Sequence, residues 1–297
     1  MIVNYYTSEM VADLLQSLQE SKIDTICIVD NSVDTAELSK LKQLECNDTS
    51  IVVVPSVSNS GFGAAVNAAI EHLDPSMDDL VWIINPDTIA ESDCLNKIEQ
   101  TLTRYPNSVV SPLITFGDRG HVWFAGGSVD IRKGRVEHQP YDSAPDLQTL
   151  EPYNVGFMCG AAPAFRYQTW KLLQGFRDDL FMYWEDVDLS IRANQSGIAL
   201  MIDPAARMWH KVGASSGNEG QSSLYYYYAA RNRILVCNTA NRTSIYSASF
   251  FLENAKFLLR PLRREHHEKI SKAASVVRGS LAGYRMVRLT SESTTVS

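Results

Sequence analysis

The sequence predicts an α/β fold in which helices cover both faces of a mostly parallel sheet, followed by a C-terminal helical extension. In the first 110 residues, short apolar segments alternate with segments whose apolar residues recur at helical spacing. The short segments are apolar almost throughout, as expected for parallel strands that are buried on both faces. Beyond residue 222 only helical patterns remain, and these predict the extension.

The N-terminal elements follow one another in strand-then-helix order. Strands are expected at residues 2–6, 25–30, 51–54, 80–84 and 109–110. Helices are expected at residues 10–19, 35–44, 63–73 and 94–104. Ligands of such sheets bind beyond the carboxyl ends of the strands. The polar residues that directly follow a strand are therefore the first candidates for a site, namely Asp30, Asn31 and the segments 59–63 and 85–87.

The rest of the chain is less regular. We expect hairpins and loops between residues 116 and 148, with a mobile loop at 142–146, and a strand at 198–202 that leads into Asp203-Pro204. Residues 225–236 predict an aromatic-rich helix, and residues 247–289 are mostly helical, with Pro261 as a break. These changes divide the chain into three regions, residues 1–115, 116–220 and 221–297.

The composition is that of a globular protein, with 45% hydrophobic and 21% charged residues among 297. A net charge of −7 gives no reason to expect a nucleic-acid partner. The five cysteines are scattered without CxxC spacing, which argues against a disulfide framework or a zinc cluster and fits a reducing compartment. Cys27 lies in an apolar run and is expected in the core. Neither a signal peptide nor a membrane-spanning stretch is evident, so a cytoplasmic location is expected.

The tail has the opposite charge to the rest of the chain. Between residues 256 and 288 it holds nine Lys and Arg but only two Glu. One interpretation is that this tail lies on the anionic inner face of the cytoplasmic membrane. The alternative is a helical contact in a homodimer, or a cap packed on the core.

The most informative segment is FMYWEDVDLSIRA, residues 181–193. Adjacent carboxylates, Glu185 and Asp186, follow bulky aromatic residues at the start of a helical pattern. A helix N-terminus favours negative charge, and apolar walls can raise a carboxylate pKa toward that of a useful base. The alternative is a capped, solvated helix start.

Two strand ends carry candidate ligand groups. The sequence Asn85-Pro86-Asp87-Thr88 ends the most apolar strand, and Asp87 could reach a divalent cation that also binds diphosphate oxygens. The alternative is a plain Asn-Pro turn. The segment from Asn59 to Gly63, which includes Gly61, precedes an Ala-rich helix whose end favours phosphate. Its alternative is a tight turn with close helix packing.

Three further side chains are candidates from the second half of the chain. His210 could be a metal ligand or a diphosphate contact, although a single His is more often structural. Arg231 and Arg233 could neutralise phosphate or form ordinary surface ion pairs.

Taken together, these segments resemble family 2 inverting glycosyltransferases of the GT-A fold, a Rossmann-like α/β fold. The resemblance covers residues 2–236 and lies in the order and spacing of six segments. They are VDNS at 29–32, NSGFGAAVNAAI at 59–70, INPDT at 84–88, GFRDDLFMYWEDVDLSIRANQSG at 175–197, the His210–Ser215 element at 210–215, and YYYYAARNR at 225–233. The sequence NPD at residues 85–87 resembles the corresponding motif of bacterial rhamnosyltransferases that build cell-surface polysaccharide.

The resemblance implies a role for each candidate residue. Asp186 would be the catalytic base, with Glu185 as its support or as the base itself. Asp87 and His210 would hold Mg²⁺ or Mn²⁺. Asp30 would contact the pyrimidine, Trp184 would offer a platform for a sugar face, and Arg231 would contact phosphate. The other residues expected to bind the donor are Asn59, Gly61, Asn67 and Asn85. Arg177 departs from the family pattern and is expected to be structural.

The resemblance also implies the reaction and its partners. Residues 1–115 would bind the nucleotide sugar, residues 116–220 the acceptor, and the chain would transfer L-rhamnose from dTDP-L-rhamnose to a glycan or lipid-linked glycan in polysaccharide synthesis for the O-antigen, capsule or cell wall. The alternatives are a UDP-sugar donor, such as UDP-galactofuranose or UDP-glucose, and an inactive assembly partner. A pyrophosphorylase or a dehydrogenase is disfavoured, because the glycine motif is weak.

Overall fold

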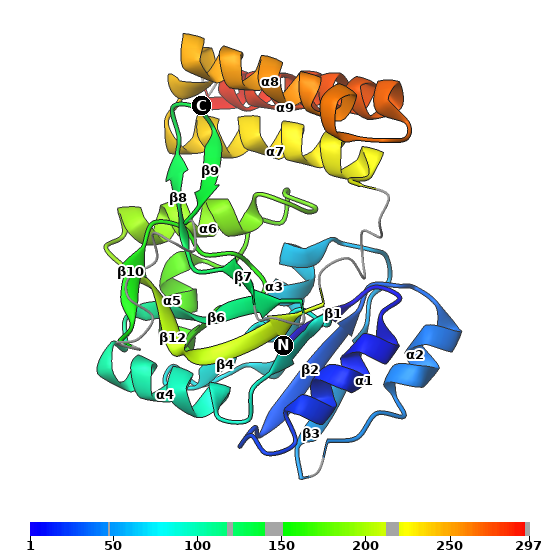
Figure 1. The fold of residues 1–297 in the computed structure, drawn as a ribbon, viewed down its shortest axis with the longest axis vertical. Coiled ribbons are helices and arrows are strands. Elements are labelled where there is room, and N and C mark those ends of the chain that lie inside the picture. The colour runs from blue at the N-terminus through cyan, green and yellow to red at the C-terminus, as the bar shows by residue number, and fades with distance from the viewer. Residues whose placement is uncertain (47, 118–120, 140–150, 212–219, 295–297) are drawn as a thin grey trace.

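A computed structural model describes residues 1–46, 48–117, 121–139, 151–211 and 220–294. The expected mobile loop at 142–146 lies outside these residues. The described chain is an α/β body with a layer of helices stacked on one end, as predicted (Figure 1).

The strands of the described chain are β1 (Ile2–Asn4), β2 (Thr25–Asp30), β3 (Ser50–Pro55), β4 (Leu80–Trp82), β5 (Thr88–Ala90), β6 (Ser108–Phe116), β7 (His121–Phe124), β8 (Gly127–Asp130), β9 (Arg135–His138), β10 (Tyr153–Val155), β11 (Ala164–Arg166) and β12 (Ala199–His210). The helices are α1 (Ser8–Ser17), α2 (Thr35–Leu41), α3 (Phe62–Leu73), α4 (Cys94–Arg104), α5 (Tyr167–Leu173), α6 (Glu185–Gln195), α7 (Ser223–Ala240), the 3₁₀ helix η3 (Ser244–Tyr246), α8 (Ala248–Arg264) and α9 (Lys269–Thr294).

The sheet has a parallel N-terminal part and a mixed central part. Within the described residues, β1, β2 and β3 pair in parallel, and β1 approaches β4 through a parallel bridge between Ile2 and Ile84. The central part follows the order β10-β12-β6-β11-β4, in which β6 and β12 are parallel and β11 is antiparallel to both neighbours. The expected hairpins of the middle region are β6–β7 and β8–β9.

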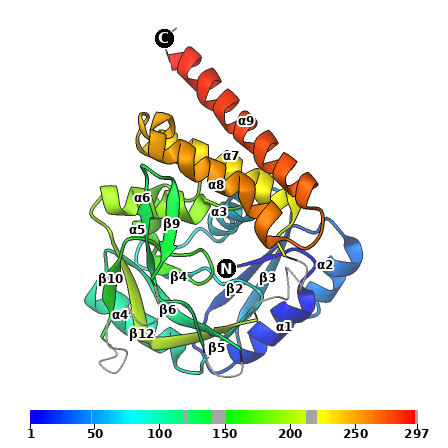
Figure 2. The ribbon, with the colours of Figure 1, turned by 45° about the horizontal axis from the view of Figure 1, so that its top comes forward.

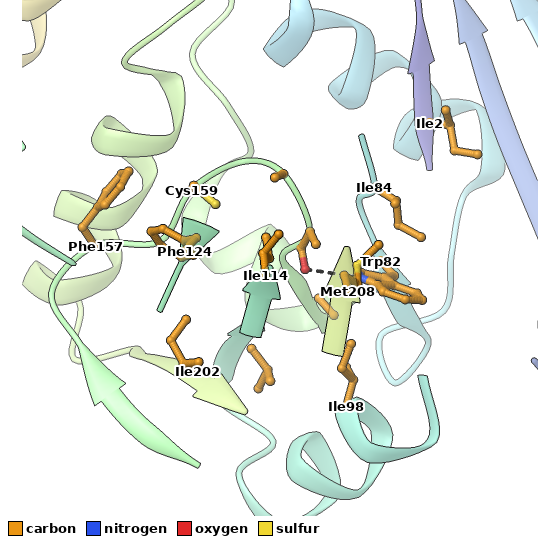
Figure 3. Packing of buried hydrophobic residues seen from close by; sticks show 14 of the residues in the cluster. Ile2, Trp82, Ile84, Ile98, Ile114, Phe124, Phe157, Cys159, Ile202 and Met208 are labelled. Atoms are coloured by element: carbon orange, nitrogen blue, oxygen red, sulfur yellow. Dashed lines mark hydrogen bonds between the residues drawn. The ribbon is translucent and has the colours of Figure 1, made fainter. Parts of the chain in front are cut away.

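The main apolar cluster joins strands of both parts of the sheet to helices. Ile2, Ile84, Ile114 and Ile202 come from different strands or strand ends and are buried in the same cluster (Figure 3). The indole Nε1 of Trp82 donates to the carbonyl oxygen of Ala162 at 3.1 Å, so its polar atom is satisfied inside the core. Cys27 is fully buried, as expected.

Two sequence expectations about proline were wrong. The strand expected to lead at residue 202 into Asp203-Pro204 continues through Pro204 to His210. Pro204 falls where the pairing of β12 with β6 shifts register, so its missing N–H breaks no regular ladder. Pro261 does not break the tail helix either. The helix α8 runs from Ala248 through Pro261 to Arg264.

The break in the tail comes at residues 265–268, next to a buried ion pair. The carboxylate of Glu265 accepts hydrogen bonds from the Tyr226 hydroxyl at 2.8 Å and from the Gln221 backbone N–H at 3.2 Å. The Lys272 ammonium donates to the same carboxylate at 2.8 Å, and both charged side chains are buried. One of the nine basic residues of the tail is therefore internal. No helix in the described ranges is both long and apolar enough to cross a membrane.

Candidate active site

The turns at the carboxyl ends of the N-terminal strands are joined to one another. The Asn31 side-chain N–H donates to the carbonyl oxygen of Gly61 at 3.0 Å, and the Phe62 N–H donates to the carbonyl oxygen of Phe181 at 3.1 Å. Gly61 has φ +87°, and a Cβ there would lie 1.9 Å from the Phe181 oxygen. Only glycine can hold this position, because both the backbone angle and the space exclude a side chain.

The same edge of the sheet is connected to the predicted base, Asp186, by hydrogen bonds to residues 160 and 161. The Asn85 N–H donates to the carbonyl oxygen of Ala161 at 2.8 Å. The neighbouring Gly160 N–H donates to Oδ2 of Asp186 at 3.2 Å. The strand end that carries Asp87 and the helix start that carries Asp186 therefore share one short backbone segment.

The adjacent carboxylates at the start of α6 have different surroundings. Asp186 accepts hydrogen bonds from the N–H groups of Gly160 and Val187. Glu185 is buried, and its Oε2 has no hydrogen-bond partner among the described residues. The alternative of a solvated helix start is therefore wrong for Glu185.

These surroundings raise the pKa of both carboxyl groups. Burial, followed by repulsion from Asp186, raises the pKa of Glu185 to about 8. Burial also raises the pKa of Asp186, and the two N–H donors oppose that rise, so it reaches only about 6. Near neutral pH the pair holds Asp186 ionised beside a protonated Glu185, which is the charge state that a general base needs.

Asp87 and His210 form a second pair at the neighbouring strand end. Nε2 of His210 lies 3.6 Å from Oδ1 of Asp87, and the imidazole stacks on the Trp123 ring at 4.4 Å between centroids. Burial lowers the pKa of His210, although Asp87 partly opposes this, so the ring is neutral near pH 7. Nδ1 is buried, with no partner in the part of the chain that the structure describes.

A carboxylate oxygen and a neutral imidazole nitrogen fit a divalent cation that takes its other ligands from a substrate. Mg²⁺ is often held by one or two carboxylates together with phosphate oxygens, and Mn²⁺ also accepts imidazole. Among the described residues no three His, Cys, Asp or Glu side chains gather around one point. The two residues would therefore hold a cation only together with a diphosphate.

Asn67 and Arg231 hold the loop before α6 instead of facing the two acid pairs. The Asn67 amide pairs with the N–H and carbonyl groups of Phe176 and with Asp178. The Arg231 guanidinium donates to the carbonyl oxygen of Asp179 at 2.6 Å and lies over the Tyr228 ring. Their predicted contacts with a donor remain predictions.

The remaining predicted donor-binding residues lie along the same edge. Asp30 is buried, and its Oδ1 accepts hydrogen bonds from the Asn4 amide and the Ser32 N–H. Asn59 is exposed, and its side chain accepts from the Gly61 N–H. Trp184 is half-buried against the main apolar cluster, with φ +74°. Asn85 is also half-buried.

Sequence reasoning missed the side chains that fix the loop before α6. Asn232 is fully buried and donates to the carbonyl oxygens of Met182 and Tyr183 at 2.9 and 2.8 Å. Asp188 pairs with Arg192 at 2.7 Å, and Arg192 also donates to the carbonyl oxygens of Leu173 and Gly175. The four-residue spacing of Asp188 and Arg192 was a usable signal. Asn232 lies in the segment YYYYAARNR at 225–233, but no role was predicted for its side chain.

Two arginines are structural. Arg177 pairs with Asp179 at 2.8 Å and with Asp188 at 3.4 Å, and this agrees with its expected role. Arg233 was expected to contact phosphate or to form a surface ion pair. It is buried instead, donates to the carbonyl oxygen of Lys133 and lies over the Phe250 ring at 4.6 Å.

A cavity of about 410 Å³ lies away from these residues. Its lining includes Thr25, Ile26 and Leu80, at the amino ends of β2 and β4. The candidate site is at the carboxyl ends of the strands, so this cavity is separate from it.

Comparison with known proteins identifies the family of the chain. The family model described as Glycosyl transferase family 2 matches residues 1–172, which is more than half of the chain. The chain therefore belongs to glycosyl transferase family 2.

A curated relative carries a more specific name. An N-acetylglucosaminyl-diphospho-decaprenol L-rhamnosyltransferase of Mycobacterium tuberculosis is 28% identical over 192 residues. The match covers 58% of this chain and 62% of the relative, so the chain spans less than two thirds of that protein.

Solved structures show the GT-A fold at low sequence identity. A crystal structure of GalNAc-T7 with UDP, GalNAc and Mn²⁺ is similar with a TM-score of 0.64 and 13% identity, covering 92% of this chain and 52% of that one. The structure of S. aureus TarS is similar with a TM-score of 0.50 and 16% identity, covering 89% of this chain and 43% of that one.

Proposed function

We propose that this chain is an inverting glycosyltransferase that moves L-rhamnose from dTDP-L-rhamnose to a lipid-linked glycan in cell-surface polysaccharide synthesis. One observation carries the proposal. The start of α6 and the strand end before Asp87 are bound to the same backbone segment: the Gly160 N–H donates to Asp186, and the Ala161 carbonyl oxygen accepts from the N–H of Asn85, two residues before Asp87. Asp87 in turn lies beside His210, so this arrangement supports a base near a place for a diphosphate.

The roles follow from the charge states. Asp186 takes the proton of an acceptor hydroxyl, and Glu185, holding its own proton, adds no second charge beside it. The hydroxyl oxygen forms a bond to the anomeric carbon as the bond from that carbon to the diphosphate oxygen breaks. Attack opposite the leaving group inverts the configuration, and the nucleoside diphosphate carries away the electron pair.

Asp87 and His210 would hold Mg²⁺ or Mn²⁺, which when bound neutralises charge on the leaving diphosphate. Replacing Asp87 by Ala is then expected to remove most of the gain in dTDP affinity that Mn²⁺ gives, about tenfold or more. Isothermal titration with and without Mn²⁺ measures this gain, and Glu71→Ala, an exposed carboxylate on α3, is the control. If Mn²⁺ raises the dTDP affinity of Asp87→Ala as much as that of the wild type, these residues do not bind the cation.

The choice of donor and acceptor is supported by the name of the mycobacterial relative and by the NPD form of residues 85–87. A nucleotide-release assay with dTDP-rhamnose, dTDP-glucose, UDP-glucose and UDP-galactofuranose tests the donor. Release with dTDP-rhamnose alone, stimulated by a polyprenyl-diphosphate GlcNAc acceptor, supports the proposal. Release with only a UDP-sugar would establish the alternative donor, and release with none of them would favour the inactive assembly partner.

The expected location follows from that acceptor. A lipid-linked acceptor places the reaction at the inner face of the cytoplasmic membrane, with the chain held there peripherally. A homodimer through the tail is the competing use of the same helices.

A further inference from the structure

The outermost helices of the molecule expose apolar side chains along one line each. On α8, Leu252, Ala255, Leu259 and Leu262 recur at three- and four-residue spacing and are exposed, with Leu252 at 58%. On α9, Ile270, Ala274, Val277 and Leu281 do the same, with Leu281 at 65%. Such spacing puts each set on one side of its helix. We call these eight residues the outer face.

The outer face is turned away from the rest of the protein. Phe257 and Leu258 of α8 and Val276 of α9 pack instead with Tyr226 and Ala230 of α7. Figure 1 shows α7 between α6 and the pair of α8 and α9, and Figure 2 shows α9 extending beyond the body. The inner sides of both helices are therefore used in the fold, whereas the apolar outer face is left to solvent.

Basic side chains flank the outer face. Lys256 and Arg263 beside the α8 set, and Arg278 and Arg285 beside the α9 set, are all exposed. The chain has 27 Lys and Arg against 34 Asp and Glu, and residues 248–289 hold nine of the former and three of the latter. Of those three, Glu265 is buried against Lys272 and Glu253 pairs with Lys256. The layer is net positive on an otherwise net negative protein.

We propose that the outer face docks on an anionic lipid bilayer, with the leucines at the level of the acyl chains and the arginines at the phosphates. Apolar residues with basic flanks are what such a surface recognises. A symmetric pairing with a second copy would bring two basic faces together, and among residues 248–289 the one fully exposed acidic side chain that could offset the repulsion is Glu268.

Docking would also orient the candidate site. The helix α7, which packs against α9, also carries Arg231 and Asn232, whose side chains hold residues 179–183 directly before the carboxylate pair. The docking layer and the wall of the site thus both contact α7. The docking itself is independent of the proposed reaction, while its purpose, access to a lipid-linked acceptor, rests on the proposed function.

The test is sedimentation of the full chain with extruded vesicles of phosphatidylcholine, with and without phosphatidylglycerol. We expect binding to the anionic vesicles, weakened by salt because the attraction is partly between charges. Leu252→Ser with Leu281→Ser, and separately Arg278→Glu with Arg285→Glu, should each lower the partition coefficient about tenfold or more. Leu172→Ser with Lys171→Glu on α5, an exposed pair on the body, is the matched control and should bind as the wild type does.

Equal vesicle binding by all variants would overturn the proposal. So would a wild type that ignores vesicles but is a dimer by light scattering, with the leucine variant monomeric, since that result makes the outer face a contact between copies. Thermal melts of the variants at wild-type values verify folding. Vesicle binding without transferase activity would contradict only the proposed function, and activity on a soluble acceptor without vesicle binding only the docking.

Discussion

Two neighbouring carboxylates at the start of α6 acquire different chemistry because their hydrogen bonds differ. Asp186 receives two backbone N–H groups, which stabilise its charge, whereas Oε2 of Glu185 receives none from the described residues. As the pH rises, Asp186 therefore loses its proton first, and the proton that remains on the pair is held mainly by Glu185. This separation gives the pair one base and one neutral neighbour.

The base assignment predicts the effect of Asp186→Asn. The amide keeps an acceptor for the Gly160 N–H but cannot take a proton, so kcat should fall about 10²- to 10⁴-fold with dTDP affinity unchanged. Nucleotide release and calorimetry measure the two quantities. If Asp186→Asn turns over at the wild-type rate while Glu185→Gln does not, the base is Glu185.

The raised pKa of Glu185 predicts a pH-dependent stability. Its folded value of about 8 lies above the reference value of 4.5, so its contribution is complete below the reference value and is lost as the pH rises through 8. Glu185→Gln should therefore melt progressively higher than the wild type between pH 5 and 9, by roughly 2 to 4 °C for each kcal/mol relieved. Scanning fluorimetry measures this difference, with Glu71→Gln as an exposed control. If the difference in melting temperature between Glu185→Gln and the wild type does not change with pH, the raised pKa of Glu185 is contradicted.

At this scale the sequence predicted types of residue better than their contacts. Residues at strand ends could be proposed because topology alone brings strand ends together, and Asp87 and His210 do lie side by side. The sequence could not show whether Asn67 and Arg231 contact a ligand or the protein itself. Their partners are backbone atoms of a loop, and the path of that loop depends on the whole fold.

At the scale of elements, the segment from Gly175 to Trp184 depends on side chains from other helices. Gly175, Tyr183 and Trp184 all have positive φ, which non-glycine residues rarely adopt without support. Asn67 of α3, Arg192 of α6, and Arg231 and Asn232 of α7 bind its carbonyl oxygens. The direction in which α6 presents its carboxylates is therefore set by three helices together.

Replacing Asn232 by Ala tests this support. It leaves the carbonyl oxygens of Met182 and Tyr183 without their donor, at about 1–3 kcal/mol each if they remain unpaired. We expect kcat to fall about tenfold, the KM for the donor to change little, and the acid limb of the pH–rate profile to shift, because Asp186 moves relative to Gly160. Asn238→Ala on the same helix is the control. A lower melting temperature with an unchanged pH profile and kcat would reduce Asn232 to a purely structural residue.

Regular elements were predicted closely where periodicity alone determines them. The helix expected at residues 94–104 is α4, and the helix predicted after the aromatic run begins at Glu185. The short strand β11 was missed, because its three residues, which pair with β4 and β6 on both sides, are too few to show a pattern. The two proline errors differ in origin. Pro204 lies where the pairing of β12 with β6 shifts register, so it costs no regular ladder bond, whereas Pro261 remains inside α8 although a helix-interior proline lacks the N–H for the carbonyl four residues earlier.

At the scale of the molecule, charge and core are distributed differently. The tail carries the positive charge and the body the negative, but the apolar core does not divide in the same way. The main cluster contains Val110 and Ile202 of the sheet together with Ile234 of α7 and Val287 of α9. The division at residues 115 and 220 remains a prediction about function, and it does not follow a gap in the packing.

A continuous core predicts that the body and the helical layer unfold together. Phe250 of α8 and Tyr226 of α7 are both fully buried, so removing residues 248–297 would expose apolar surface on what remains. Differential scanning calorimetry of the full chain should show one endotherm, and a chain ending at residue 247 should melt well below it or be insoluble. Two resolved transitions, or a shortened chain with the wild-type melting temperature, would show that the layer is a separate unit. For the same reason, the lipid contact is tested with exposed point variants and not by truncation.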